Sequence, residues 1–448
     1  MIIGESVIQK GASFDDSDIL GRKQLADGLT NLVKSIEGPL VFALDGPWGT
    51  GKTHFLKLWC NELEADGFPV VYFNAFEHDY QGDAFVSLVA EFISLIEEFR
   101  GVPAGRKKKF KDASVKVGKT IARSTLNVAI KAASAGVIDA TQASDAIEAA
   151  IQQIDREASA IVDQAFKAKV AQRKALASFK AELAALPAAM QKDDDGPALP
   201  LVFIIDELDR CRPNFSLEIL EVVKHFFDVP DVHFVLGCDS NQMARSVEGA
   251  YGAGFDGRKY LARFVHFSFG FESQNSPDVS KRFVTSLWDW VGVPEQHADI
   301  KAPIVDVLSE LATLNQYSLR ELQRIMSIIS LSLSFIGGRH LRVPPLVVGL
   351  AVLRVMSPEL YRKAKSGKIT YEEAVQYFGF DRETSGDNRS IEWMKEWWAV
   401  ALDASLSYED IDIFMKDIRR FNVWEREKIL PILADRVIDR FVVGGDTD

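Results

Sequence analysis

The chain has 448 residues, of which 47% are hydrophobic and 26% charged, and its formal net charge is −12. This balance is typical of a globular protein with a large core, and the length suffices for roughly two to four domains. The negative total disfavours a protein that coats nucleic acid over its whole surface, although a local basic face is compatible with it.

The first residues, "MIIGESVIQKGASFDDSDIL", lack a basic segment followed by a long apolar one, so no signal peptide is predicted. No stretch approaches ~18 consecutive apolar residues, so we expect no transmembrane span. The three cysteines (Cys60, Cys211 and Cys238) are scattered and lack C-x-x-C spacing, which favours neither disulfides nor a zinc site. Together these features predict a cytoplasmic protein.

The first third of the chain alternates strand-like and helix-like segments. A short apolar run at 40–45 predicts a buried strand, and a glycine-rich segment separates it from a predicted helix over 53–67 that ends at Gly67. Residues 68–76 predict a second strand and residues 83–99 an amphipathic helix.

The same alternation resumes only after residue 199. Residues 200–207 and 232–239 predict strands, and a helix is expected between them with Ser216 as its N-cap. Apolar strands that alternate with helices predict an α/β fold with a parallel sheet covered on both faces.

A long insertion separates the second and third strands. Residues 100–198 are rich in Ala, Glu, Lys and Leu at helical spacing, which favours long helices. The insertion begins with the basic run "RKKKFK" at 106–111, and the segment 106–119 is interpreted either as a solvated helix or loop or as a contact for phosphates or a membrane surface. The polar run at 191–196 closes it.

From about residue 273 the pattern is helical to the end. Residues 313–335 predict one helix or a helix pair. Trp393, Trp397 and Trp398 favour a core seam over an exposed partner-binding stripe. We therefore predict four regions: a first core part at 1–99, a helical insertion at 100–198, a second core part at 199–272 and a helical lid or effector-coupling region at 273–448.

The segment between the first strand and its helix matches G-x-x-x-x-G-K-[ST] at Gly46, Gly51, Lys52 and Thr53. Glycines let backbone N–H groups approach phosphate oxygens, and the start of the next helix adds its positive end. We expect Lys52 to reach the β- and γ-phosphates of a nucleotide and Thr53 to ligate Mg²⁺. The remaining residues expected to line the nucleotide are Pro47, Trp48, Gly49, Thr50 and His54.

A second motif, "LVFIIDELDRCRP", runs from five apolar residues directly into Asp206 and Glu207. At the tip of a buried strand, Asp206 is expected to hold Mg²⁺, and Glu207 to polarise the attacking water. The alternative for Glu207 is an N-capping or loop carboxylate. Asp209 and Arg210 form either a local ion pair or a contact with a neighbouring subunit.

Further candidates follow the fourth strand. Asp239 is either a γ-phosphate sensor or a turn or cap residue. Arg320 and Arg324, four residues apart on one predicted helix, are either sensor arginines or part of a solvated basic face. An arginine finger, acting in cis or in trans, could come from the group Arg258, Lys259 and Arg263, and the sequence alone does not choose its source.

These motifs resemble the KAP family of P-loop NTPases. The similar segments are "DGPWGTGKT" (45–53), "VVYFNAFEHDYQGDAF" (70–85), "IIDELDRC" (204–211), "YLARFVHFSF" (260–269), "SLRELQR" (318–324) and "DILGRKQLADGL" (18–29), the last resembling the family's adenine-side leader. Phe76 stands where the family usually has Trp, and Glu207 takes the second acidic place of the Walker B motif.

The resemblance implies a P-loop ATPase core interrupted by a helical insertion between Walker A and Walker B. In many members that insertion carries transmembrane helices, whereas here Lys131 and Asp139 interrupt the corresponding segment. It also implies ATP rather than GTP, and for bacterial members a role in phage exclusion and anti-phage defence.

Three hypotheses follow. The first is a Mg²⁺-dependent ATPase that rearranges a partner protein or nucleic acid, as a ring or dimer. The second is a nucleotide-gated scaffold that recruits an effector with little turnover. The third is a phosphotransferase that uses the same loop.

Overall fold

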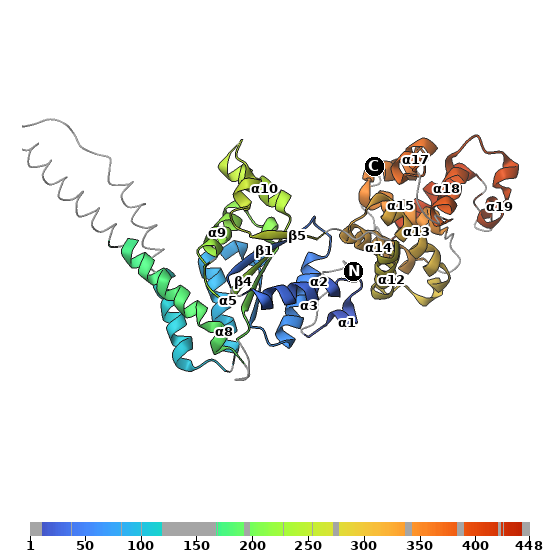
Figure 1. The fold of residues 1–448 in the computed structure, drawn as a ribbon. Coiled ribbons are helices and arrows are strands. Elements are labelled where there is room, and N and C mark those ends of the chain that lie inside the picture. The colour runs from blue at the N-terminus through green and yellow to red at the C-terminus, as the bar shows by residue number, and fades with distance from the viewer. Residues whose placement is uncertain are drawn as a thin grey trace, which may run out of the picture. The chain divides into compact units, whose positions relative to one another are not determined.

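A computed structural model describes residues 11–36, 38–81, 83–99, 101–118, 167, 169–191, 198–226, 228–252, 254–271, 277–336, 343–382, 389–419, 423 and 425–440. Within them the chain forms two compact units (Figure 1). The sheet unit comprises Leu25–Asp45 and Phe55–Gly270. The helical unit comprises the chain up to Gln24, Gly46–His54, and the chain from Phe271 onward. The region boundaries predicted from the sequence stay predictions.

The sheet unit is built on five strands: β1 (Leu40–Asp45), β2 (Val70–Asn74), β3 (Leu201–Asp206), β4 (Val232–Cys238) and β5 (Phe267–Gly270). Their order is β2-β3-β4-β1-β5, and every neighbouring pair is parallel. The predicted α/β fold with a parallel sheet is confirmed. Because parallel strands end at one edge, the register sets Asp206 of β3 opposite both Asn74 of β2 and Gly237 of β4.

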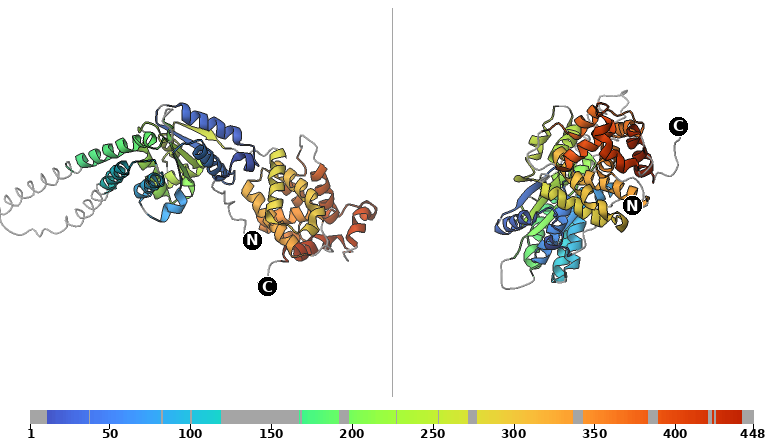
Figure 2. Two further views of the ribbon diagram at one scale, coloured as in Figure 1. Left: turned by 90° about the horizontal axis from the view of Figure 1, so that it is seen from below. Right: turned by 90° about the vertical axis from the view of Figure 1, so that its right-hand side faces the viewer.

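Alternating side chains cover both faces of this sheet. Phe203 packs on Phe92 of α5 (Ala84–Glu98), with ring centroids 4.6 Å apart, on the face that α9 (Pro213–Lys224) also covers. On the other face Phe42 meets Trp59 of α3 (Lys52–Ala65) at 6.3 Å. Figure 2 shows these helices around the sheet from two further directions. This packing explains the near-continuous apolar sequences of β1 to β4, which are buried on both faces, whereas the edge strand β5 is largely exposed.

Shorter elements complete the sheet unit. They are α4 (Ala75–His78), η1 (Asp79–Gln81), α8 (Leu186–Ala189), η2 (Leu208–Arg210), α10 (Ser240–Tyr251) and α11 (Gly257–Leu261), while α2 (Lys23–Ser35) begins two residues before this unit. Ser216 is not the N-cap predicted from the sequence. Arg212 takes that position, because Pro213 fits the first turn of a helix, and Ser216 lies inside α9 with its Oγ donating to the Pro213 carbonyl at 3.0 Å.

The two ends of the insertion pack back on the sheet unit. Helical residues 104–118 and 169–184 meet where the ring centroids of Phe110 and Phe179 are 5.2 Å apart, and Phe179 lies 5.2 Å from Phe226. In the basic run, Lys107 Nζ donates to the carbonyls of Glu97 and Phe99 at 3.0 Å. Most of the alanine-rich segment, and Lys131 and Asp139 with it, lies outside the described residues.

The helical unit packs a second core. Its elements are α1 (Phe14–Ser17), α12 (Pro277–Val291), η3 (Glu295–Ile300), α13 (Lys301–Asn315), α14 (Leu319–Ser334), α15 (Pro344–Met356), α16 (Pro358–Lys365), α17 (Tyr371–Phe378), α18 (Arg389–Leu402), α19 (Tyr408–Arg419), η4 (Arg426–Lys428), α20 (Ile429–Leu433) and η5 (Ala434–Ile438). The segment 313–335 is a helix pair, because Gln316 adopts φ 54° and Ser318 starts α14 with a capping box.

The predicted core role of the tryptophans is confirmed. Trp397 and Trp398 are buried in the helical unit, and Trp393 packs against the same core while partly buried. Trp398 Nε1 donates to the Pro345 carbonyl at 3.4 Å, which satisfies its polar atom inside the core. None of the helices in the described ranges is long and apolar enough to cross a membrane.

Candidate functional site

The glycine-rich loop follows β1 directly and leads into α3, which begins at Lys52. Gly49 and Gly51 adopt φ values of 81° and 87°, a region that residues with side chains rarely enter. The strand, loop and helix required by the motif are therefore present. Backbone N–H groups at the start of a 14-residue helix form a natural anion site.

The predicted lysine lies inside this loop. Lys52 is only 8% exposed, and its Nζ donates to the carbonyls of Gly46 and Pro47. The Thr50 hydroxyl donates to the Pro47 carbonyl at 3.0 Å, which ties the loop together. Thr53 and His54 are half-buried at the start of α3, and Trp48 is 47% exposed.

The start of α14 packs against the loop within the helical unit. The Leu319 N–H donates to the Gly49 carbonyl at 3.0 Å, and a Cβ on Gly49 would lie 3.2 Å from Cβ of Arg320. Arg320 is exposed, and so is Arg324 one turn further along. Arg320 thus lies on the helix next to the loop, while its sensor role stays a prediction.

Sequence reasoning missed Arg22, a buried cation beside the same loop. Its guanidinium carbon lies 3.8 Å above the ring of Phe271, and Nη1 would be 3.2 Å from a Cβ on Gly51. Burial lowers the pKa of Arg22 to about 10, and attraction to Asp18 opposes that shift. The signal in the sequence was the "GR" of the leader, but nothing local indicated that this arginine is buried.

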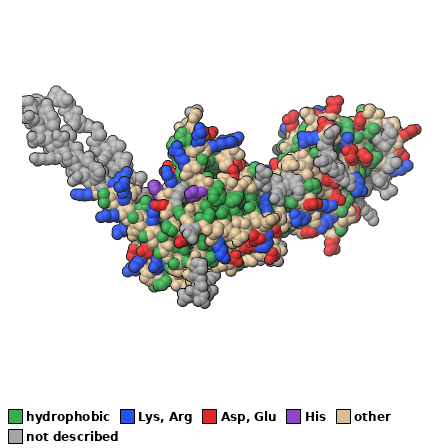
Figure 3. Space-filling model, in the orientation of Figure 1, with side chains coloured by type: hydrophobic (Ala, Val, Ile, Leu, Met, Phe, Trp, Pro, Cys, Tyr) green, Lys and Arg blue, Asp and Glu red, His purple; other side chains and the backbone are tan. Residues whose placement is uncertain are grey.

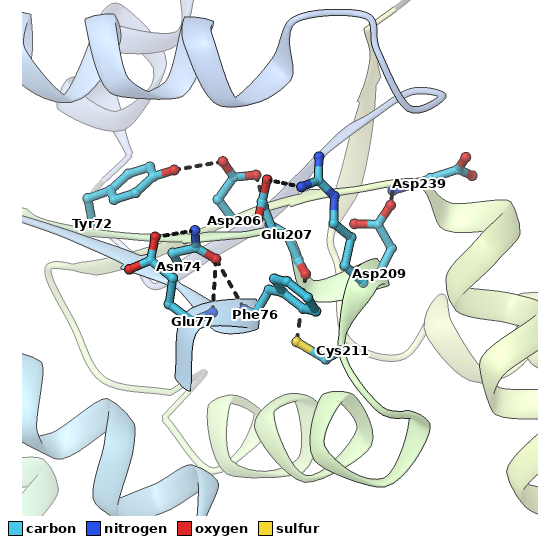
Figure 4. Close-up of polar contacts among 10 residues, drawn as sticks. Tyr72, Asn74, Phe76, Glu77, Asp206, Glu207, Asp209, Cys211 and Asp239 are labelled. Atoms are coloured by element: carbon cyan, nitrogen blue, oxygen red, sulfur yellow. Dashed lines mark hydrogen bonds and ion pairs between the residues drawn. The ribbon is translucent and has the colours of Figure 1, made fainter. Parts of the chain in front are cut away.

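The sheet unit contributes an acidic turn at the end of β3 (Figure 4). Asp206 is buried, and its Oδ2 accepts the Tyr72 hydroxyl at 2.7 Å while Oδ1 accepts the Glu207 N–H at 2.8 Å. A Cβ on Gly237 would lie 2.8 Å from Oδ1, so glycine at that position leaves room for the carboxylate.

Glu207 follows in a strained conformation. It adopts φ 58° and ψ 26°, which costs on the order of 1–3 kcal/mol for a non-glycine residue and is typical of functional sites. The side chain is 5% exposed, and Oε1 lies 2.6 Å from Nη1 of Arg210. Arg210 therefore pairs with Glu207, whereas Asp209 accepts the Asp239 N–H at 3.1 Å. The two alternatives for Asp209 and Arg210, a local ion pair or a contact with a neighbouring subunit, stay predictions.

A short helix after β2 braces this turn. Asn74 Oδ1 accepts the N–H of Phe76 at 3.1 Å, which caps α4 and ends the strand earlier than the predicted residue 76. Asp79 accepts from the backbone N–H of Arg212 at 2.9 Å and from its Nε at 2.8 Å. The ring of Phe76 is 51% exposed next to the turn.

The turn also encloses a cysteine. Burial raises the pKa of the Cys211 thiol to about 12, and the nearby carboxylates of Asp79, Asp209 and Glu207 add to this shift. Cys211 is thus a structural thiol, and it is the last residue of the segment 204–211 on which the family resemblance partly rests.

The candidates beyond β4 have partners of their own. Asp239 caps α10 and accepts the N–H groups of Asn241 and Gln242 at 3.0 and 3.2 Å. Its capping role is shown, and its sensing role stays a prediction. In the second cluster Arg258 Nη2 donates to Asn241 Oδ1 at 2.7 Å, Lys259 pairs with Asp256 at 3.3 Å, and Arg263 is exposed. No arginine finger is assigned among them.

Each of the two units contains an oxygen donor of the kind that magnesium prefers. Mg²⁺ in phosphate-handling sites is held by one or two oxygen ligands of the protein together with phosphate oxygens. The Thr53 hydroxyl and the Asp206 carboxylate are ligands of that kind. Among the described residues, no cluster of three or more His, Cys, Asp or Glu side chains is arranged to hold a metal.

Comparison with known proteins supports this interpretation. The family described as "KAP family P-loop domain" matches residues 22–335. A search of curated proteins found no match. Among solved structures, the ORC2 protein of Aeropyrum pernix, titled as ADPNP–ADP complexes, matches with 12% identity and a TM-score of 0.38 over 94% of this chain and 97% of that chain.

Proposed function

Because the chain belongs to the KAP family of P-loop NTPases, we propose that it is a Mg²⁺-dependent ATPase. The carrying observation is the pair of features at the carboxyl ends of β1 and β3. One is a glycine loop that encloses Lys52, and the other is the buried carboxylate pair Asp206 and Glu207. Nucleotide binding follows from the family, and hydrolysis is the proposed part.

In this proposal the loop residues 46–54 bind the phosphates through their backbone N–H groups. Lys52 leaves its loop carbonyls to donate to the β- and γ-phosphates, and Thr53 and Asp206 supply oxygens to the cation. Bound magnesium supplies charge neutralisation at the phosphates. Glu207 orients and deprotonates the attacking water, and Arg320 donates to the γ-phosphate. Catalysis of this kind is mainly positioning and charge stabilisation.

The ion pair of Glu207 sets a condition on this role. A carboxylate bonded to a guanidinium is a weaker base, because protonation would break the pair. With Oε1 2.6 Å from Arg210, Glu207 accepts a proton from water either on Oε2 or, once it has exchanged that partner, on Oε1. The ion pair between Glu207 and Arg210 favours the second candidate, a nucleotide-gated scaffold with little turnover. That candidate describes the protein before a partner protein or nucleic acid binds to it.

We further propose that turnover rearranges a partner complex that includes other proteins or further copies of this chain. In bacterial members of the family that work lies in anti-phage defence, and the same role is proposed for this protein. The helical insertion and the helices from residue 273 onward are the parts that transmit the change. A nucleic acid is a further candidate partner.

The decisive experiment compares wild type with Lys52→Ala and Glu207→Gln. We expect Lys52→Ala to lose ATP affinity, because the cation that meets the phosphates is gone. Glu207→Gln keeps its affinity and lowers the rate of phosphate release by about 100-fold or more, the order of magnitude for removing a group that activates the nucleophile. Fluorescent-ATP titration and phosphate release measure the two effects.

The controls separate the alternatives. Lys57→Ala changes another lysine of α3, whose Nζ lies 5.7 Å from the ring of Tyr72, and should leave both measurements within two-fold of wild type. Absence of nucleotide affinity in wild type contradicts the proposal, and a Glu207→Gln variant that hydrolyses ATP like wild type contradicts the assigned base. Release of a single phosphate per chain supports the scaffold, and γ-phosphate recovered on an acceptor supports a phosphotransferase.

A further inference from the structure

An exposed aromatic cluster joins α10 to α11 on the sheet unit. Tyr251, the last residue of α10, is 50% exposed, and Phe255 in the following loop is 37% exposed. Their rings are stacked, with centroids 4.6 Å apart and planes inclined by 19°. Tyr260 of α11 supports both rings, at 5.4 Å from Tyr251 and 5.7 Å from Phe255. We call Tyr251, Phe255 and Tyr260 the aromatic tip.

The tip is held in place although it is exposed. A Cβ on Gly257 would lie 2.3 Å from the Ala244 carbonyl, so α11 crosses α10 in backbone contact. The Tyr251 and Tyr260 hydroxyl oxygens are 3.3 Å apart, and Tyr260 also lies 3.4 Å from a carboxylate oxygen of Glu221. Large apolar surface that stays exposed on a fixed support is typical of a binding site.

Positive charge surrounds the aromatic tip. Residues 245–263 contain four basic side chains (Arg245, Arg258, Lys259 and Arg263) and two acidic ones (Glu248 and Asp256), a net charge of +2 in a chain of −12. All four basic side chains are exposed, and Figure 3 shows Lys and Arg side chains gathered over α10 and α11.

A polar cavity lies along the same helices. It has a volume of about 500 Å³, and its lining includes Arg245 and Arg258 together with the carboxylates of Asp239 and Glu248. Arg258 is bonded to Asn241 at 2.7 Å and Lys259 to Asp256 at 3.3 Å. Exposed pairs of this kind are weak, so these cations can exchange their present partners for a phosphate.

We propose that the aromatic tip and its arginines bind single-stranded nucleic acid. Every base has a flat π-face that stacks on an aromatic side chain, and a basic groove that follows the backbone is the usual companion of such a platform. In a duplex the base faces are already stacked on each other, so the tip favours unpaired bases. A peptide of Asp and Glu would use the arginines but offers no aromatic ring to stack on the aromatic tip.

This site goes beyond the proposed ATPase and does not depend on it. The test measures fluorescence anisotropy of labelled 20-nucleotide oligodeoxythymidine, and of its RNA counterpart, with the full chain at several salt concentrations. We expect Tyr251→Leu/Phe255→Leu to weaken binding about ten-fold or more, because an aliphatic side chain fills the space without offering a ring face. Circular dichroism and the thermal midpoint verify that this variant is folded.

Arg245→Gln/Arg258→Gln addresses the phosphates separately. Each lost phosphate contact lowers the slope of log affinity against log salt by about 0.7 for single strands, so a decrease of about 1.4 is expected. Arg362→Gln/Lys368→Gln removes the same charge from exposed positions on α16 and just after it, and should leave affinity within two-fold and the slope unchanged.

Three results would overturn the proposal. The first is that wild type binds neither the DNA strand nor the RNA strand. The second is that the leucine variant binds as tightly as wild type, and the third is that the control variant loses as much affinity as the arginine variant. Displacement of the strand by polyglutamate as readily as by unlabelled strand would also overturn it and would favour an acidic protein partner. Failure of a duplex to compete at equal nucleotide concentration supports the proposal.

Discussion

Glu207 shows how single residues prepare this site. Its carboxylate is buried, its backbone is left-handed and its partner Arg210 is three residues away in the same turn. Breaking a buried ion pair by removing one partner costs about 3–5 kcal/mol, whereas exchange of one partner for another avoids that cost. A water molecule bound beside the nucleotide would replace Arg210 as the partner of Glu207, and a new anion would replace Glu207 as the partner of Arg210.

Gly237 leaves room for the neighbouring carboxylate of Asp206, and a substitution at this one residue tests that role. A Cβ there would lie 2.5 Å from Cδ1 of Leu56 and 2.8 Å from Oδ1 of Asp206. The leucine methyl can shift, but movement of Asp206 disturbs its bond to Tyr72. We expect Gly237→Ala to lower affinity for nucleotide in the presence of magnesium by about ten-fold, a loss of about 1.4 kcal/mol.

Titration with and without magnesium measures this effect, because affinity in the absence of the metal should change little. Gly270→Ala in β5 is the matched control, since a Cβ at Gly270 meets nothing within 4 Å. Equal losses with and without magnesium would show that Gly237 acts on the whole sheet rather than on Asp206.

At the scale of elements, close helix packing holds the helical unit together. α15 is buried along most of its length, and Gly349 in its middle faces Trp398 of α18. A Cβ on Gly349 would lie 2.5 Å from Cζ2 and 2.8 Å from Nε1 of that indole. The glycine therefore sets how closely the two helices approach. Trp398 is fully buried, so its ring has no free space into which it can move.

We expect Gly349→Ala to destabilise the helical unit. Alanine favours a helix over glycine by about 1 kcal/mol, but overpacking in a core costs about 1–3 kcal/mol and prevails here. Urea unfolding followed by tryptophan fluorescence measures the change. Gly28→Ala in α2 is the comparison, because a Cβ there meets nothing within 4 Å and only the helix preference remains. A Gly349→Ala variant as stable as Gly28→Ala would show that the helices adjust.

At the scale of the whole molecule, the chain returns to each unit more than once. The leader up to Gln24, the loop at Gly46–His54 and the chain from Phe271 onward belong to one unit, although β1 and β2 with most of α3 belong to the other. The glycine-rich loop Gly46–His54 of one unit is therefore joined covalently to Asp45 and to Phe55 of the other unit, which contains the sheet.

We expect the hydrolysis-deficient Glu207→Gln protein to change its assembly state with nucleotide. The chain mass is 49.8 kDa, and ATP with magnesium should shift the particle mass to a multiple of this value, because the bound state persists when hydrolysis is slow. Mass photometry or light scattering measures it, with Lys52→Ala as the control. An unchanged mass in ATP would contradict a nucleotide-dependent oligomer.

The amino-acid sequence by itself determined the parts of this protein that depend on neighbours in the chain. Apolar runs of four to seven residues and the spacing of glycines, Lys52 and Thr53 specify a strand, a loop and a helix locally, and Asp206 and Glu207 follow their strand in the same way. Local rules were weaker at boundaries, where Pro213 displaced Ser216 as the start of a helix.

Only the tertiary structure decided which distant residues meet. Tyr72 bonds to Asp206 across 134 positions, Asp79 to Arg212 across 133, and Arg22 lies beside Gly51 in the folded unit. No periodicity or motif encodes these pairs, because each depends on the order β2-β3-β4-β1-β5 or on helix packing rather than on sequence spacing. Burial, which removes water and strengthens every charge interaction, is likewise a property of the packed molecule.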